Sequence, residues 1–215
     1  MKKLLALVIA SLFLRSAFAQ TCFVLPPICD IRDRGFGPQV GLITLCDDGL
    51  GITLGGYNSV KNFAGVQIGA MSCCTSDFYG IQANAFSSIS EECYGLQCAT
   101  VNFTSYINGI QVGVLNQICH GGGTPFSGFL QIGAANESES SFAGLQVGII
   151  NMVQLTFAGI QLGVYNKALS GGGIQVGVIN EINFPDTEAF LIQIGCVNMS
   201  GCSSYPILPI LRATW

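Results

Sequence analysis

Apolar and polar residues alternate in short stretches that recur along most of the chain. The recurring unit reads Gly-φ-Gln-φ-Gly-φ-φ-Asn, where φ is apolar, and its clearest copies begin at Gly109, Gly144, Gly159 and Gly173. Alternation with a period of two, carried by Val, Ile and Leu, is typical of β-strands. Two glycines within five residues also disfavour a helix. The pattern therefore predicts a series of short strands, and an all-β fold.

The glutamine position of this unit recurs eleven times at nearly constant spacing. Successive copies lie 14, 14, 15, 15, 14, 20, 15, 15, 14 and 18 residues apart, so the longer intervals indicate insertions around residues 119–126 and 184–189. Such a period is the signature of a repeat protein. We predict structural repeat positions at Gln39, Thr53, Gln67, Gln82, Gln97, Gln111, Gln131, Gln146, Gln161, Gln175 and Gln193, and at Asn116, Asn136, Asn151, Asn166, Asn180 and Asn198.

Short regular strands can stack as a parallel solenoid or run up and down as an antiparallel barrel. A solenoid coil of 14–15 residues needs a second strand whose apolar side chains close the core. Nine residues after the Gln position the sequence is mostly polar, as at Asp48, Asn62 and Ser76. The unit is also symmetric about its Gln, so antiparallel strands can align Gln beside Gln. The sequence thus favours an up-and-down β-barrel, with a parallel β-solenoid as the alternative.

The distribution of charge favours a membrane-type barrel. Only 9% of the residues are charged, against about 25% in a typical soluble domain. From three residues before each Gln position to five after it there is no Asp, Glu, Lys or Arg; charges such as Glu137, Lys167 and Glu181 are assigned to the connections. Strands of about nine uncharged residues suit a bilayer, where a charge on the lipid face costs about 2–4 kcal/mol.

In that barrel of 11–12 strands, the apolar neighbours of each Gln face lipid and the Gln faces inward. Ile110 and Val112 would contact lipid, whereas Gln111 would point into the barrel. The stretch from Tyr205 to Trp215 supplies a possible last strand, although Pro206 and Pro209 each remove a backbone donor there. Inward amides would line a polar pore or, as the simpler alternative, bond to one another.

The start of the chain has the pattern of a signal peptide. Lys2 and Lys3 precede an apolar stretch, and Ala17-Phe18-Ala19 is a typical cleavage signal. We predict a signal peptide at 1–19, an N-terminal segment at 20–36, a β-repeat domain at 37–198 and a C-terminal segment at 199–215. Without the signal peptide, 5 basic and 12 acidic residues remain, a formal charge of −7. This balance argues against nucleic acid as a partner.

The ten cysteines all follow the predicted signal peptide. Export permits disulfides, and we expect a few structural bridges between neighbouring turns, whose pairing the sequence does not reveal. A zinc site is not predicted, because Cys73-Cys74 and Cys93…Cys98 lack the usual spacing and His120 is the only histidine.

One segment has the composition of an oxyanion hole. His120-Gly121-Gly122-Gly123 is similar to the HGGG run of some esterases, but the chain has no Gly-x-Ser-x-Gly elbow and no second histidine to act as base. We therefore predict no catalytic, cofactor-binding or metal-binding residues, and no enzymatic activity.

The units around Gln111, Gln146, Gln161 and Gln175 resemble those of a family of bacterial surface-repeat proteins known from Leptospira, with related arrays in Bacteroidetes. The resemblance covers roughly Gly37 to Asn198, and the Pro-Ile-Leu-Pro-Ile-Leu run with terminal Trp215 is similar to the family's ending. The copies at Gln82 and Gln97 depart from the family pattern because Asn84 and Ala99 replace the second Gly, and Thr53 replaces the Gln of another copy. Ten cysteines also exceed the usual number. The resemblance implies export to the bacterial outer membrane or cell surface, and it implies no known chemistry.

Three functions remain open for an exported, non-enzymatic protein of this kind. The first is a small outer-membrane barrel with a structural or surface-contact role, for which outer-membrane lipid is the expected partner. The second is a secreted solenoid for adhesion or ligand binding, and the third is a passive pore. The sequence predicts no particular ligand or protein partner.

Overall fold

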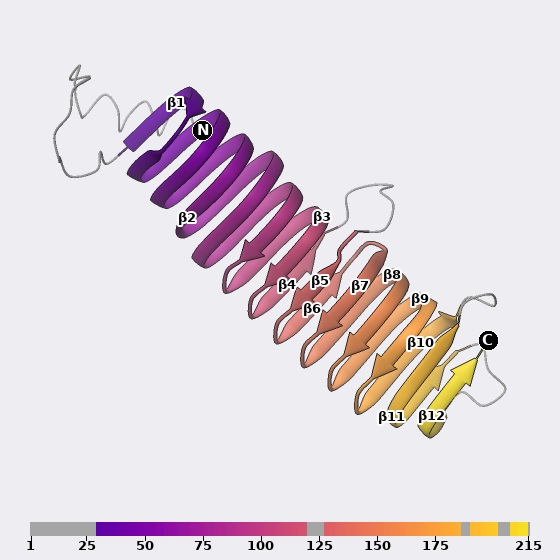
Figure 1. Cartoon of the computed structure of the whole chain (residues 1–215). Coiled ribbons are helices and arrows are strands. Elements are labelled where there is room, and N and C mark those ends of the chain that lie inside the picture. Colours follow the sequence, from indigo (N-terminus) through magenta and orange to yellow (C-terminus); the bar gives the residue numbers. More distant parts are fainter. Residues whose placement is uncertain (1–28, 120–126, 186–189, 202–206, 215) are drawn as a thin grey trace, which may run out of the picture.

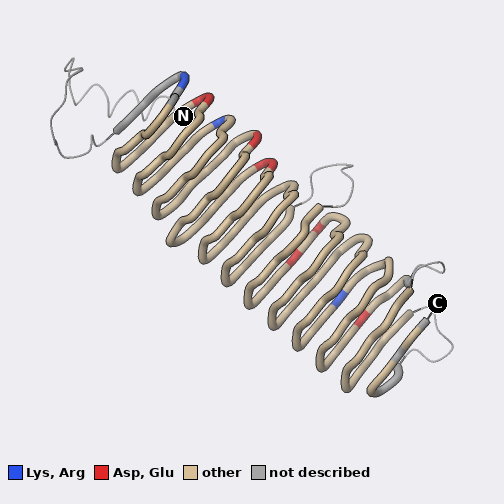
Figure 2. Tube along the Cα trace, viewed as in Figure 1, with Lys and Arg blue, Asp and Glu red and all other residues tan. Residues whose placement is uncertain are grey.

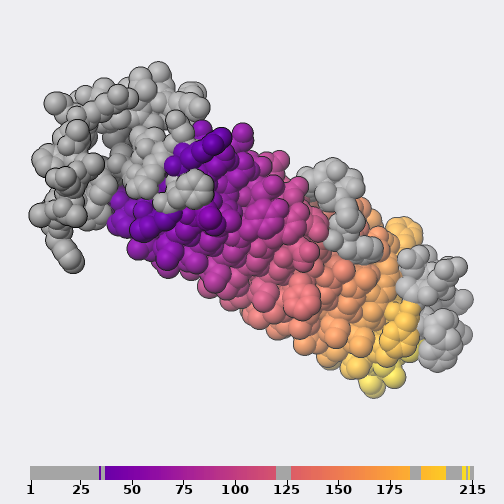
Figure 3. Space-filling model, turned by 45° about the horizontal axis from the view of Figure 1, so that its top comes forward, coloured from indigo at the N-terminus to yellow at the C-terminus, as the bar shows by residue number. Residues whose placement is uncertain are grey.

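The chain winds into a parallel β-solenoid, a straight stack of flattened coils (Figure 1). The structure is a computed structural model, and it describes residues 29–119, 127–185, 190–201 and 207–214. In the space-filling view the stack is an elongated rod (Figure 3). The described part of the chain contains no helix with the length and hydrophobicity that a transmembrane span requires.

Twelve strands make up one sheet that follows the coils around the core. β2 is long because its backbone stays extended through several successive coils. The strands are β1 (Cys29–Phe36), β2 (Gln39–Cys98), β3 (Val101–Val112), β4 (Leu115–Ile118), β5 (Leu130–Ile132), β6 (Ala135–Ser138), β7 (Phe142–Val147), β8 (Ile150–Leu162), β9 (Tyr165–Val176), β10 (Ile179–Pro185), β11 (Leu191–Ser200) and β12 (Ile207–Thr214).

Each coil has two walls, which the coil of Gln146 illustrates. Wall A is the stretch from four residues before the Gln position to one after it, here Phe142–Val147. Wall B runs from four residues after the Gln position to seven after it, here Ile150–Val153. The glycine edge, at 148–149, joins the two walls within a coil, and the turn edge, at 154–156, leads to the next coil. Every wall pairs in parallel with the same wall of the next coil.

The register of the stack follows the sequence repeat. Gln146 pairs with Gln161, and Asn151 pairs with Asn166, so equivalent positions form straight rows. The register also continues across both insertions, because Gln111 pairs with Gln131 and the Gln175 position pairs with Gln193. The additional residues therefore leave the stack without shifting it.

The core follows from the alternation of side chains along each strand. The inward positions nearest the glycine edge hold the buried Gln and Asn rows, and those nearest the turn edge hold apolar side chains. Phe142 and Phe157 occupy paired positions in this apolar region, and with Val153 and Ile182 they belong to one buried cluster, all at most 1% exposed. Burial of these apolar side chains supplies the hydrophobic part of the stability.

Glycine two residues before the Gln is required by close backbone approach. Gly159 has φ +148°, a region that other residues rarely adopt, and an added Cβ would overlap the carbonyl oxygen of Gly144 in the preceding coil. Glycine at this position thus lets successive coils stack at the spacing of a parallel sheet.

The C-terminal end of the stack is covered by β12, which pairs antiparallel with β11. Its register with β11 shifts between Gly195 and Asn198, where the coil turns at the glycine edge. There Ile210, opposite Gly195, has the left-handed φ of 71°. β12 thereby occupies the backbone edge that the last coil would otherwise expose.

The prediction of an up-and-down barrel is wrong, and the alternative of a parallel solenoid is confirmed. A barrel requires antiparallel neighbours and a closed ring, whereas the repeat strands pair in parallel with their copies in the next coil. The second wall is present, but it lies four to seven residues after the Gln, not nine. The inward residues of this wall include the buried Asn row, whereas the prediction required apolar side chains there.

The assignment of all charges to connections is also wrong. Glu137, Lys167 and Glu181 lie in β6, β9 and β10, on wall B, as the charges midway along the coils of the C-terminal half show (Figure 2). Asp47, Lys61, Asp77 and Glu91 occupy the turn edge of the N-terminal half. Lys167 forms an ion pair with Glu181, with Nζ and Oε1 3.1 Å apart.

Several sequence predictions fall on parts of the chain outside the described residues. The signal peptide at 1–19, His120-Gly121-Gly122-Gly123 and Trp215 belong to them. The cysteines whose side chains are described have free thiols, so the bridges expected between neighbouring turns do not occur among them: Cys46, Cys73, Cys74, Cys93, Cys98, Cys119 and Cys196.

Candidate functional site

The Gln row forms a continuous hydrogen-bonded ladder from Gln67 to Gln193. Each Nε2 donates to Oε1 of the Gln in the preceding coil, for example from Gln146 to Gln131 and from Gln161 to Gln146, both at 2.7 Å. The Gln side chains of this ladder are completely buried. A buried amide without a partner would be costly, and the ladder removes that cost because each copy satisfies the next.

The Asn row forms a second ladder with the opposite donor direction. Asn151 Nδ2 donates to Asn166 Oδ1 of the following coil at 2.8 Å, and its other proton goes to the carbonyl oxygen of Leu162 at 2.9 Å. The same pair of bonds recurs at Asn116 and Asn180. Because the Gln ladder donates toward the N-terminus and the Asn ladder toward the C-terminus, their amide dipoles oppose each other.

The N-terminal part of both rows uses other side chains. Thr44, Asn58, Ser72 and Ser88 hold the Asn position there, and Thr44 Oγ1 donates to Asn58 Oδ1 at 2.7 Å. Thr44, Asn58 and Ser72 were not predicted, although each lies five residues after its Gln-row position, as Asn116 does after Gln111. Ser88 lies six residues after Gln82, so this spacing would not have revealed it. In the Gln row, Thr53 interrupts the ladder, and Gln39, Thr53 Oγ1 and Gln67 Nε2 have no hydrogen-bond partner.

These contacts place all predicted repeat residues in the core. The Gln row, Thr53, and the Asn row from Asn116 to Asn198 are each at most 1% exposed. The amides of the continuous ladders bond to neighbouring coils, and Phe142 and Phe157 fill the turn-edge half of the interior. The interior of these described coils is therefore packed with protein groups, and the surface available for contact is the outside of the two walls.

Wall A presents aliphatic and aromatic side chains to the outside over the length of the stack. In the described coils no Asp, Glu, Lys or Arg lies on this wall. Tyr79 stacks on Tyr94 of the next coil, with ring centroids 4.8 Å apart. Nine large aliphatic residues next to the Gln row are 37–46% exposed: Val40, Ile52, Leu54, Ile68, Ile81, Ile132, Ile160, Leu162 and Ile194.

Wall B is different because a polar network crosses its C-terminal half. Besides the ion pair with Lys167, Glu181 accepts a hydrogen bond from the Tyr165 hydroxyl at 2.7 Å. Burial and this bond raise the pKa of Tyr165 to about 12. Glu137 accepts a bond from Gln154 Nε2 at 2.7 Å. In the described coils, wall A is therefore uncharged and wall B carries charge.

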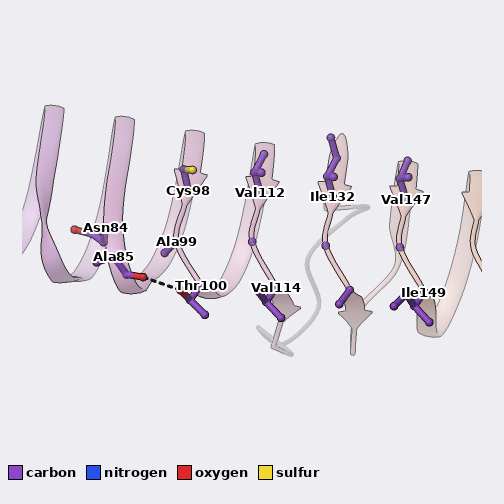
Figure 4. A pocket seen from close by; sticks show the side chains of 14 residues that line it. Asn84, Ala85, Cys98, Ala99, Thr100, Val112, Val114, Ile132, Val147 and Ile149 are labelled. Atoms are coloured by element: carbon purple, nitrogen blue, oxygen red, sulfur yellow. Dashed lines mark hydrogen bonds between the residues drawn. The ribbon is translucent and has the colours of Figure 1, made fainter.

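An open groove of about 750 Å³ runs along the middle of the glycine edge. One side is the column of Cys98, Val112, Ile132 and Val147, and the other includes Val114 (Figure 4). A second groove continues the same edge nearer the C-terminus, between Val176 and Val178. Both extend the apolar surface of wall A around the edge.

The glycines on the floor of these grooves have a structural explanation. A Cβ at Gly148 or Gly163 would meet Asn136 Nδ2 or Asn151 Nδ2 at 2.7 and 2.6 Å. Space for the Asn ladder thus requires glycine at this position, independently of any ligand.

Among the described residues no group of three or more His, Cys, Asp and Glu side chains is arranged to hold a metal ion. Comparison of the chain with protein-family models, with curated proteins and with solved structures finds no match. The resemblance to the Leptospira-type surface repeats stays a prediction.

Proposed function

We propose that this chain is an exported, non-enzymatic solenoid for adhesion or ligand binding, and that wall A is its contact surface. The observation that supports this proposal is the continuous, uncharged outer surface of wall A. Contiguous exposed apolar patches on soluble monomers rarely exceed a few hundred Å², and larger ones mark interaction sites.

The size of wall A can be estimated from strand geometry. Its six residues span about 20 Å, and the ten steps from the coil of Gln39 to that of Gln193 span roughly 48 Å, which gives a face of about 1,000 Å². This area is well above the usual size of an apolar patch. The packed interior and the paired amides also support contact over conduction through a pore.

The proposal can be tested with two substitutions in the same strand. Ile160 on wall A is 39% exposed and Ile150 on wall B is 41% exposed, and both belong to β8. Lysine at either position adds the same charge to a similarly exposed site. We expect cells that display the Ile160→Lys chain to lose most of their attachment to hexadecane droplets, and Ile150→Lys to leave it near the wild-type level.

Equal attachment by all three chains would contradict the proposal. Protease treatment of intact cells shows whether the protein reaches the surface, so that loss of display is not mistaken for loss of contact.

A further inference from the structure

We propose that the partner of wall A is a second copy of this chain, and that two solenoids pack wall A against wall A. This inference rests on the proposed function, because it identifies what the contact surface binds.

The area is sufficient for a stable pair. A standard protein interface buries about 800 Å² on each partner. Wall A offers about 1,000 Å² by the strand geometry given above, so a face-to-face pair would use most of one wall. An interface of this size also leaves wall B and the turn edge, with their charges, in water.

The absence of charge on wall A limits the surfaces that fit it. A partner with charged side chains would have to bury them without a counter-ion, and unpaired buried charges are strongly unfavourable. A second wall A brings no charge. Wall B fits less well because Glu137, Lys167 and Glu181 lie on it.

The spacing of side chains is the same on both copies. Leu145 pairs with Ile160, and Ile160 pairs with Ile174, so the outward residues of wall A form columns along the stack. Successive rows are about 4.8 Å apart on each copy. Side chains of one wall can therefore interdigitate with those of the other along its whole length, as in packed β-sheets.

Such a pair closes on itself. The same surface is used by both copies, which gives a two-fold interface and a dimer, not a filament. A substitution on wall A then appears twice in the interface.

Analytical ultracentrifugation of the purified chain tests this inference, with the variants introduced above. We expect wild type and Ile150→Lys to sediment as dimers at micromolar concentration. Ile160→Lys should raise the dimer dissociation constant at least about tenfold. Equal circular dichroism spectra show that both variants are folded; the thermal midpoint does not serve as this control, because association of the folded chain raises it. Ile68→Lys, 46% exposed on wall A of another coil, provides a second test if Ile160→Lys does not fold.

The possible results separate this inference from the proposed function. A wild-type chain that is monomeric at every concentration, or a dimer that Ile160→Lys and Ile68→Lys leave intact, would overturn the pairing. If such a monomer still attaches to hexadecane through wall A, or binds vesicles of phosphatidylethanolamine and phosphatidylglycerol through it, the contact function stands and the partner is a lipid surface. If neither association nor attachment depends on wall A, both proposals fail.

Discussion

The Gln row is continuous in one part of the solenoid and broken in another. From Gln67 to Gln193 each amide donates to the preceding copy at 2.7–3.0 Å. In the first coils Thr53 interrupts the row, and Gln39 has no partner on either side-chain atom. The same residue type therefore has opposite consequences at Gln146 and at Gln39. We therefore expect a buried amide to stabilise this fold where a neighbour in the row bonds to it, and to destabilise the fold where neither neighbour does.

The stacking of the continuous part depends most on its glycines. Gly159→Ala should lower the free energy of unfolding by about 4 kcal/mol, because the alanine combines an unfavourable φ with overlap of a backbone oxygen. Gly37→Ala is the control at the N-terminal end, since φ there is +87° but no atom lies within 4 Å of the added Cβ. Urea unfolding should show a clearly smaller loss for Gly37→Ala; equal losses would mean that the coils are not stacked at this distance.

Replacing a buried Gln by Met should change the free energy of unfolding differently in the continuous and the broken part of the Gln row. Gln146→Met leaves Gln131 Oε1 without a partner and leaves Gln161 Nε2 with only its 3.3 Å bond to the carbonyl oxygen of Lys167, so we expect a loss of about 2–3 kcal/mol. Gln39→Met removes an amide that has no partner and should be neutral or stabilising by about 1 kcal/mol. Denaturant midpoints measure both effects. Similar losses at the two positions would contradict the ladder.

Repair of the broken ladder should stabilise the protein. Thr53→Gln places an amide between Gln39 and Gln67, both of which have unpaired atoms, and should add about 1–2 kcal/mol. Thr53→Met fills similar space without an amide and serves as the matched control. A thermal midpoint that rises equally in both variants would show that filling space, and not hydrogen bonding, is responsible.

The smallest predicted effect concerns the thiols in the core of the N-terminal half. Burial raises the pKa of Cys93 from 9.0 to about 12 and that of Cys74 to about 11. The folded state therefore favours the protonated thiols, and this contribution to stability is complete below pH 9 and is lost between pH 9 and 12. We expect the thermal midpoint to fall between pH 9 and 11, and to fall less in Cys93→Ala. An equal decline in the variant would contradict this assignment.

The sequence predicts the period, the inward Gln and the outward apolar neighbours correctly because all three depend on alternation within one strand. It also locates the insertions, since a regular spacing exposes any additional residues. These features are local or strictly periodic, and they need no knowledge of the neighbouring coil.

The second wall could not be predicted by requiring apolar residues in it. Asn151 and Asn166 are buried because each bonds to the other across coils, and this relation appears only once the stacking direction is known. The lack of charge had two causes that the sequence does not separate. Inside the coils the amides replace charges, and outside them wall A is apolar. The uncharged strands were therefore interpreted as membrane-spanning strands of a barrel, whereas they pair in parallel as coils of a solenoid.

The distance between the first and last coils tests the open stack most directly. Leu45 and Met199 lie on wall B in the coils of Gln39 and Gln193, and both can be replaced by a ketone-bearing amino acid that is then coupled to a nitroxide. Excess unlabelled protein suppresses distances between labels on different molecules. Ten steps of about 4.8 Å predict roughly 48 Å between the labelled positions by double electron–electron resonance. A closed up-and-down barrel would bring them within roughly 10 Å across the closing strand, and that result would contradict the solenoid.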